Sequence, residues 1–371
     1  MKKIKILING KEITCEEGEL ILEVARRNKI NIPSLCYHSD LEPSGGCRLC
    51  LVSIKGRNGF FTACSTKTED GMEIITESDE LDKLRKINLE MLFAQHVEYC
   101  SECMRKYNCR LLSLAKKYNV NLRKFEDRKK DYSKLQFGPA ILFKSNKCID
   151  CRNCVEICKK QGVGFLEIKQ NGPFFEVIPS DSKNKDCVYC GQCVAHCPSA
   201  AFEVADSIKE VEDALKNKKK YVVFQFAPSI RTSIGEEFKM PYGSIVTNKL
   251  IGAMKKLGAK KVFDVSSAAD VTTIEEAEEL IERINKKKKL PMFTSCCPAW
   301  VKFVEFYYPK FIPQLTSVRS PQIIMGGIIK KYVSKIIKVN PKDIFIVSIM
   351  PCTAKKYEIT RKELKINNDL F

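Results

Sequence analysis

No apolar run in this sequence is long enough to cross a membrane, which takes about 18 consecutive apolar residues. The amino-terminal stretch MKKIKILINGKEITC begins like a signal peptide, but Asn9, Gly10 and Lys11 end its apolar run too early for one. Apolar residues make up 44% of the chain and charged residues 29%, which is typical of soluble globular proteins. We therefore expect a cytoplasmic protein without a membrane partner.

The lysine-rich runs at 216–220 and 286–289 lack interleaved aromatic residues and match no nucleic-acid-binding motif, which argues against a nucleic acid partner. The formal net charge is +18. It would fall to about +11 if most cysteines were thiolates bound to iron. A basic protein suits a small acidic redox partner through electrostatic steering. The alternative is a lysine-rich composition whose charges are simply solvated helix ends.

Cysteine is what the sequence has in abundance, with 19 among 371 residues. A chain of this length suggests about two to four domains. In a reducing compartment, so many cysteines are more often metal ligands than disulfides. Most of them fall into three groups with the spacing of metal-binding sites.

The first group contains a C-x2-C pair flanked by more distant cysteines. Clustered central cysteines with a remote fourth are typical of plant-type [2Fe–2S] sites, and Gly45 and Gly46 allow a tight turn beside the cluster. A zinc site with four thiolates is the alternative. A hairpin about Asn9–Gly10 and a helix over 20–28 favour a β-grasp ferredoxin domain over 1–80. The ligands of this group are Cys36, Cys47, Cys50 and Cys64.

The second group follows a helical pattern over 81–95 and defines a small helical domain over 81–125. His96 and Cys100 are four residues apart, so we expect them on one helix face, with Cys103 three residues further on. Cys109 closes the site from a loop. This set predicts a [4Fe–4S] cluster with three cysteines and one histidine, and zinc remains the alternative because spacing does not separate the two.

The third group consists of two runs of the form C-x2-C-x2-C-x3-C, as in bacterial two-cluster ferredoxins. In such runs the fourth cysteine binds the other cluster. We therefore predict two [4Fe–4S] clusters in a ferredoxin-like domain over 139–210, after a linker at 126–138. One cluster takes Cys148, Cys151, Cys154 and Cys197. The other takes Cys187, Cys190, Cys193 and Cys158.

Four cysteines remain, and we expect Cys15 to be a buried apolar residue of a strand. From about residue 221, apolar runs alternate with helical segments, which predicts an α/β sheet. Because ligands of such sheets bind beyond the carboxyl ends of the strands, Cys296, Cys297 and Cys352 should converge at one edge. Neighbouring residues that leave a strand point to opposite sides, so one of the adjacent thiols can bind a metal while the other faces elsewhere. The expected strands are 221–226, 261–265, 290–293 and 344–350.

The segments TSCCPAW (294–300) and MPCTAKKYE (350–358) resemble the first two active-site motifs of the [FeFe]-hydrogenases, with Ala299 where that family generally has glycine. APSIRTSIGEEF (227–238) and AADVTTIEEAEEL (268–280) are similar to further family segments. The order of the accessory sites also matches the family's longer members, and the resemblance covers the whole chain. It implies reversible H2 oxidation and proton reduction, with electrons relayed through the accessory clusters to ferredoxin, and cluster maturation proteins as partners.

The resemblance also assigns roles in the last third of the chain. Cys297 and Cys352 would ligate the [4Fe–4S] half of the hydrogen-activating cluster, and Cys296 would pass protons to its two-iron half. The proton path would continue through Glu276, Thr316, Glu279 and Arg283. Without the resemblance, the two glutamates are better explained as an acidic first helical turn. The residues expected to line the two-iron pocket are Pro228, Ser229, Gln322, Met350 and Lys355, the last as a donor to cyanide ligands.

The chain departs from the family after Cys352, because the family's third motif supplies two further cysteines, one of them bridging the two halves of the cluster. We therefore expect residues 218–371 to be a partial α/β hydrogenase catalytic domain. The chain would then be a gene fragment, an interrupted reading frame or half of a split enzyme. Together with the β-grasp, helical and ferredoxin-like parts, the expected fold class is a mixture of α+β and α/β domains.

Two other functions compete with the hydrogenase hypothesis. The iron–sulfur subunits of NADH dehydrogenase and formate dehydrogenase resemble residues 1–200 but lack TSCCPAW and MPCTAKK. An electron-transfer protein with a non-catalytic hydrogenase-like part is the second alternative, and the absent third motif favours it for this polypeptide alone.

Overall fold

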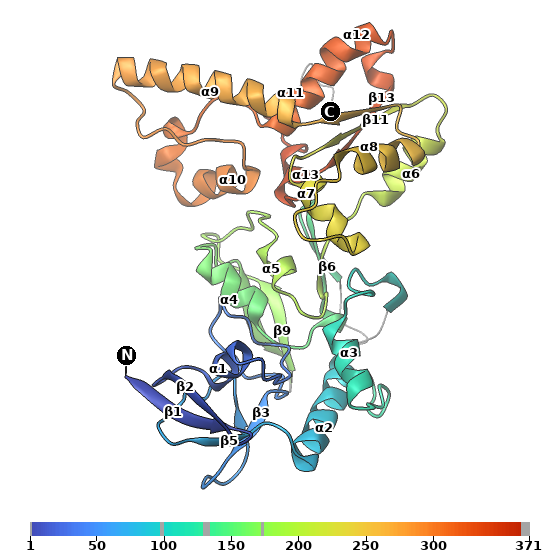
Figure 1. The fold of residues 1–371 in the computed structure, drawn as a ribbon. Helices are drawn as coiled ribbons and strands as arrows, with labels where there is room; N and C mark the ends of the chain where they lie inside the picture. The colour runs from blue at the N-terminus through green and yellow to red at the C-terminus, as the bar shows by residue number, and fades with distance from the viewer. Residues whose placement is uncertain (1, 97–99, 129–133, 172–173, 365–371) are drawn as a thin grey trace. The chain divides into compact units, whose positions relative to one another are not determined.

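The computed structural model describes residues 2–96, 100–128, 134–171 and 174–364 (Figure 1). Two compact units make up the chain. Unit 1 comprises residues 1–136, 142–185 and 192–203, and unit 2 comprises residues 137–141, 186–191 and 204–371. No helix in the described part of the chain is long and apolar enough to span a membrane.

A five-stranded mixed sheet opens unit 1, in the order β2–β1–β5–β3–β4. The predicted hairpin is confirmed, because β1 and β2 pair antiparallel around Asn9 and Gly10, both at positive φ. The helix expected over 20–28 is α1, and Cys15 is buried in β2 as predicted. The elements are β1 (Lys3–Ile8), β2 (Lys11–Glu16), α1 (Ile21–Arg27), β3 (Leu51–Ile54), β4 (Phe61–Thr62) and β5 (Glu73–Ile75).

Helix α2 (Asp79–Gln95) begins at Ser78, whose hydroxyl accepts a hydrogen bond from the Leu81 amide. The buried Arg85 of this helix donates to the carbonyl oxygens of Leu49, Leu51 and Thr76, which ties the helix to the first sheet. These bonds satisfy carbonyl groups that burial would otherwise leave unpaired.

The prediction that His96 and Cys100 share one helix face is wrong. Helix α2 ends at Gln95, His96 has extended backbone angles (φ −115, ψ 97), and Cys100 begins the separate turn η1 (Cys100–Glu102). The His96 ring instead bonds to the Lys147 carbonyl, a partner 51 residues away that helical periodicity cannot reveal.

The rest of the cysteine-rich region is built from short elements. Helix α4 carries Cys154 and Cys158 of the first ferredoxin-type cysteine run, the β8–β9 hairpin follows that run, and α5 carries part of the second run. Strands β6, β7 and β10 form a sheet in the order β10–β7–β6. The bounds are α3 (Arg110–Lys117), β6 (Lys134–Phe137), β7 (Ile141–Lys144), η2 (Ser145–Lys147), α4 (Asn153–Lys160), β8 (Leu166–Asn171), β9 (Phe174–Pro179), α5 (Gln192–Ala195) and β10 (Phe202–Val204).

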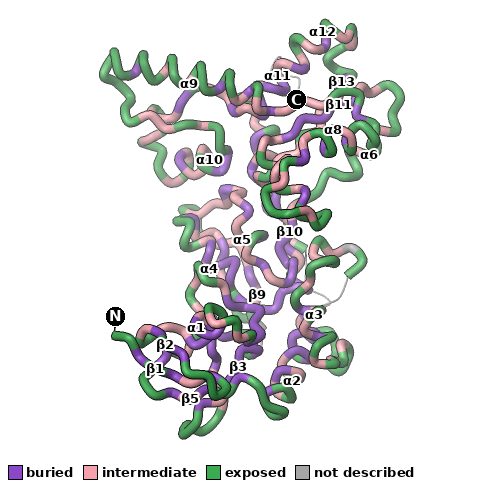
Figure 2. The backbone as a smooth tube through the Cα atoms, viewed as in Figure 1, coloured by how far each residue is buried: buried purple, intermediate pink, exposed green. Residues whose placement is uncertain are grey.

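Unit 2 contains a parallel sheet in the order β12–β11–β13 with helices on both faces. One face packs against α6 and α8, and the other against α9 and α11. Burial on both faces explains why β11 is apolar except for Gln225 and is buried over most of its length (Figure 2). The strands are β11 (Tyr221–Phe226), β12 (Lys261–Asp264) and β13 (Ile344–Ile349).

The expected strand at 290–293 is absent from the described sheet, and the prediction of four strands is wrong. Phe293 forms only an isolated bridge with Leu315. Pro291 lacks the amide hydrogen that a ladder requires, and four apolar residues are a weak signal for a strand. The helices are α6 (Ile208–Lys216), α7 (Ile230–Ser233), α8 (Thr247–Lys256), α9 (Ser266–Lys286), α10 (Pro298–Tyr307), α11 (Pro321–Ile328), α12 (Ser334–Ile336) and α13 (Ala354–Glu358). The remaining short turns are η3 (Ile234–Phe238), η4 (Pro309–Gln314), η5 (Ile329–Val333), η6 (Pro341–Asp343) and η7 (Lys362–Leu364).

Candidate metal centres and active site

Four buried cysteines converge in the amino-terminal domain, each at most 3% exposed: Cys36, Cys47, Cys50 and Cys64. Hydrogen bonds from Cys47 and Cys64 lower the pKa of the Cys36 thiol, and Cys50 makes a similar contact with Cys64. Gly45, at φ +60, provides the turn into Cys47. Four thiols in mutual contact fit the ligand set of one metal centre with four thiolates.

A second pocket in unit 1 is lined by one histidine and three cysteines, namely His96, Cys100, Cys103 and Cys109. The His96 Nδ1–H donates to the Lys147 carbonyl oxygen at 2.8 Å, which leaves Nε2 with its lone pair. Burial lowers the pKa of His96 and so favours the neutral imidazole that metal binding requires. The four side chains fit a metal centre with three sulfur ligands and one nitrogen ligand.

The first ferredoxin-type set also forms a buried group in unit 1, made of Cys148, Cys151, Cys154 and Cys197. Burial raises the pKa of the Cys151 and Cys154 thiols, and the charges of Cys148 and Cys197 raise both further. In the other predicted set, Cys158 and Cys193 belong to unit 1 and Cys187 and Cys190 to unit 2. The grouping of those four stays a prediction.

In unit 2, Cys297 and Cys352 come from different elements and meet. Cys297 is the N-cap of α10, and Cys352 lies between β13 and α13. A hydrogen bond from Cys352 lowers the pKa of Cys297 to about 5; burial opposes this shift, and the amides of Ala299 and Trp300 support it. The sulfur thus lies at the positive end of a helix, where a thiolate is favoured.

A pocket beside Cys352 also takes in Gln322, Met350 and Lys355, three of the five predicted pocket residues. Pro228 and Ser229 lie at the carboxyl end of β11, between that strand and α7, and are not among the described residues that line this pocket. The structure therefore groups part of the predicted set and leaves two residues outside it.

The polar side chains of this pocket hold one another in place. The Lys355 ammonium donates to the Cys296 carbonyl oxygen at 2.8 Å and pairs with the Glu358 carboxylate at 3.0 Å. Gln322 is 2% exposed and donates to the same carboxylate at 3.2 Å. The Gln322 Oε1 atom is buried and has no hydrogen-bond partner within the described residues. A buried amide oxygen without a partner fits a pocket that holds a polar ligand.

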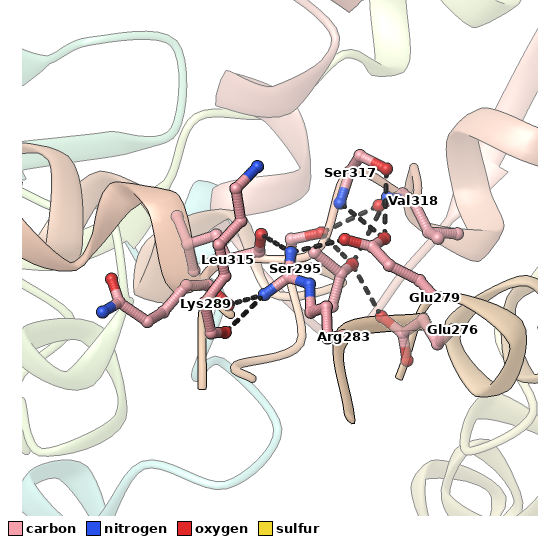
Figure 3. A network of polar contacts seen from close by, with 10 residues as sticks. Glu276, Glu279, Arg283, Lys289, Ser295, Leu315, Ser317 and Val318 are labelled. Atoms are coloured by element: carbon pink, nitrogen blue, oxygen red, sulfur yellow. Dashed lines mark hydrogen bonds and ion pairs between the residues drawn. The ribbon is translucent and has the colours of Figure 1, made fainter. Parts of the chain in front are cut away.

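A polar network between α9 and the segment after α10 consists of two hydrogen-bonded groups, which adjoin along the chain at Thr316 and Ser317 (Figure 3). The Thr316 hydroxyl donates to Glu276 at 3.1 Å, and Ser317 donates to Glu279 through both its amide and its hydroxyl at 3.0 Å. Arg283 pairs with Glu279. Although burial acts to raise it, the hydrogen bonds from Ser317 and Arg283 lower the pKa of Glu279.

The network also bears on the role of the two glutamates. Helix α9 begins at Ser266, so Glu276 and Glu279 lie in its middle, and the alternative of an acidic first turn is wrong. The network reaches Ser295, whose hydroxyl lies 3.1 Å from that of Thr316. Cys296 is the next residue and is exposed, and no hydrogen bond joins its thiol to Thr316 within the described residues.

Sequence reasoning missed several residues that support these sites. Ser295 and Glu358 lie inside the motifs TSCCPAW and MPCTAKKYE, so those motifs offered a signal for them. Lys147 is buried and pairs with Glu203 at 3.0 Å, while its carbonyl oxygen orients His96. Nothing in the local sequence around Lys147 indicates that role.

Comparison with known proteins gives each part of the chain a counterpart. Residues 220–370 match the family described as iron only hydrogenase large subunit, C-terminal domain. Residues 1–79 match a 2Fe-2S iron–sulfur cluster binding domain, 85–123 match the NADH-ubiquinone oxidoreductase-G iron–sulfur binding region, and 147–201 match a 4Fe-4S dicluster domain. These matches define an iron–sulfur redox protein.

Relatives with similarity along the whole chain refine that class. The NADP-reducing hydrogenase subunit HndD of Solidesulfovibrio fructosivorans is 34% identical, over 100% of this chain and 66% of that protein. Iron hydrogenase 1 of Clostridium pasteurianum is 37% identical, over 97% of this chain and 64% of its own length. The chain is an [FeFe]-hydrogenase-like protein with amino-terminal iron–sulfur domains, as its motifs predict. It spans about two thirds of the length of these relatives.

A solved structure shares the fold of about half the chain. The NAD+-reducing [NiFe]-hydrogenase in its H2-reduced state superposes with a TM-score of 0.51 and 24% identity, over 55% of this chain and 88% of that one. At this identity the likeness concerns the fold alone.

Proposed function

We propose that the chain serves reversible H2 oxidation and proton reduction, H2 ⇌ 2H+ + 2e−, with the electrons relayed through accessory iron–sulfur clusters to ferredoxin or a similar acidic carrier. The observation that carries the proposal is the meeting of Cys297 and Cys352 beside the pocket that contains Gln322 and Lys355. This pairing joins the two family motifs in space.

The cofactors of the proposal are one [2Fe–2S] cluster, three accessory [4Fe–4S] clusters and a hydrogen-activating cluster held by Cys297 and Cys352. When bound, that last cluster supplies the iron chemistry that splits or forms H2. The proposed layout assigns residues 1–80, 81–125 and 139–210 to the accessory sites, with a linker at 126–138. Residues 218–371 form the hydrogenase-like part. We place the protein in the cytoplasm.

The residues of the chain divide the remaining work between binding and proton transfer. Lys355 is fixed by Glu358 and by the Cys296 carbonyl, so its ammonium is held at the pocket and can donate to anionic ligands. The Cys296 thiol is exposed and adjoins Ser295 in the chain, so it can exchange a proton between the cluster site and the polar network. Thr316, Glu276, Glu279 and Arg283 continue the path toward solvent.

A second candidate is an electron-transfer iron–sulfur protein whose hydrogenase-like part does not turn over. It is favoured by the contrast between sites with four ligands in unit 1 and a site with only two converging cysteines in the described part of unit 2. Both candidates share the electron relay and differ in hydrogen chemistry.

The test is to mature the chain anaerobically with the family's assembly proteins, and to measure iron content and H2 evolution from reduced viologen. About 14 irons in the accessory clusters are expected in either case. Hydrogen evolution supports the hydrogenase function, whereas full iron without hydrogen supports the second candidate. Cys15→Ala is the matched control, because Cys15 is buried in β2 and should leave both readings unchanged.

A further inference from the structure

Two histidines and an aspartate that none of the cluster sites uses lie together in unit 1. His38 and Asp40 are in the loop that follows Cys36, and His196 lies between α5 and Cys197. A ring nitrogen of each histidine and a carboxylate oxygen of Asp40 all lie within 4.8 Å of one another. The two imidazole rings are in contact, with centroids 4.3 Å apart at an angle of 43°.

His196 presents a nitrogen that is ready to accept a metal ion. Its Nδ1 lies 2.9 Å from the Gln192 carbonyl oxygen, which can only accept, so Nδ1 carries the hydrogen and Nε2 has the lone pair. That Nε2 is buried and has no hydrogen-bond partner within the described residues. Histidines that bind metals characteristically donate their other ring N–H to a carbonyl or carboxylate in this way.

His38 and Asp40 complete the donor set. The Asp40 amide donates to His38 Nδ1 at 3.2 Å, so this nitrogen carries no hydrogen, and an ion bound to it would take the place of that hydrogen bond. The Asp40 Oδ2 atom lies 3.7 Å from the same nitrogen. Tetrahedral zinc ligands at about 2.1 Å from the ion stand about 3.4 Å apart, so a small movement closes this pair around an ion.

Backbone contacts hold both segments in position. The Lys160 ammonium of α4 donates to the Asp40 carbonyl oxygen at 2.6 Å, and the Asn153 side chain of the same helix contacts the His196 carbonyl oxygen at 3.4 Å. Both contacts use main-chain oxygens, so the Asp40 carboxylate and the His196 ring remain available. The side chain of Asp40 is 64% exposed, which leaves a path for an ion from solvent.

We propose that His38, Asp40 and His196 bind a divalent transition-metal ion, with Zn2+ the best match to two imidazoles and one carboxylate, at a site separate from the iron–sulfur clusters. Two imidazole ligands and one carboxylate are a common zinc set with an open fourth position. The ion links the loop of Cys36 to the segment of Cys197, residues predicted to ligate two different clusters. Its positive charge stabilises the reduced state of a neighbouring cluster, so it raises that cluster's midpoint potential. The proposal does not depend on hydrogen turnover.

The test uses the full chain with its clusters loaded and without a histidine tag, titrated anaerobically with Zn2+ in a calorimeter. Wild type should bind one ion beyond its iron. Asp40→Asn should weaken binding at least about tenfold, and His196→Gln should remove it. Glu42→Gln, which removes a nearby carboxylate outside the set, is the matched control and should bind as wild type does.

Iron content and the paramagnetic resonance signal of the reduced [2Fe–2S] cluster report that the clusters are intact in each variant. His196 is next to Cys197, so His196→Gln can also lower the iron content. In that case Zn2+ binding by wild type is compared with binding by Asp40→Asn alone, because Asp40 is exposed. Zn2+ should also raise the [2Fe–2S] midpoint potential in wild type and not in Asp40→Asn. The proposal is overturned if wild type shows no saturable binding, or if Asp40→Asn binds as tightly and shifts the potential as much as wild type.

Discussion

The accessory sites of unit 1 and the hydrogenase-like site of unit 2 use cysteine in opposite ways. In unit 1, each candidate metal site gathers either four cysteines or three cysteines and one histidine, and most of the sulfur atoms are buried. In unit 2, two cysteines meet at the start of a helix, and the neighbouring pocket contains the polar side chains of Gln322 and Lys355, which both bond to Glu358. An electron relay needs only a well-held cluster, whereas proton and hydrogen chemistry needs groups that bind, donate and accept around it.

The largest expected effect separates the two adjacent thiols of unit 2. In a catalytically complete form of the enzyme, Cys297→Ser should abolish turnover and remove the iron held there, because it deletes a ligand. Cys296→Ser should keep that iron and lose turnover through proton supply. Iron content and H2 evolution check both variants, and an equal loss of iron in the two would contradict this division.

His96 of unit 1 offers the next test, since its substitution distinguishes an iron site from a zinc site. His96→Ala should lower iron content by about four atoms per chain if the pocket holds a [4Fe–4S] cluster. An unchanged iron content together with a loss of zinc would show that the site is a zinc site. Cys15→Ala serves as the control for substitution at a buried position outside all cluster sites.

The polar network of unit 2 should yield a smaller, pH-dependent effect. Glu279→Gln leaves the buried Arg283 without its carboxylate, at a cost of about 1–3 kcal/mol. The native pKa of Glu279 is lowered from 4.5, so its stabilising contribution is present above that value and is lost as the pH falls through the lower native pKa. Amide hydrogen exchange of residues 266–286 measures this loss of local stability. Exchange in wild type that does not rise toward that of the variant at low pH would contradict the assignment.

The smallest effect concerns the start of α2 in unit 1. Ser78→Ala removes the hydroxyl that accepts from the Leu81 amide, which should cost about 1 kcal/mol of local stability. Faster hydrogen exchange confined to the first turn of α2 is the expected reading. Ser78→Asp, which retains an acceptor at the cap, should restore protection, and failure to do so would argue against the cap.

The comparison also explains which predictions succeeded. Strands β11, β12 and β13 and the hairpin β1–β2 follow apolar patterns that are local in the sequence, and the structure confirms them. The strand expected at 290–293 rested on four apolar residues and failed, because the competing contacts of Phe293 involve Leu315, 22 residues away in the chain. The shared helix face of His96 and Cys100 failed for the same reason, since a distant carbonyl group sets the histidine.

The sequence by itself determined the family, because short motifs are local and chemically specific, and its cysteine spacing predicted the ligand sets. The tertiary structure alone decided how Cys297 meets Cys352, how Glu358 and Gln322 surround Lys355, and how His38 meets His196. These contacts join residues up to 158 positions apart. These contacts form because the core packs closely and buried polar groups need partners, and no local pattern in the sequence predicts them.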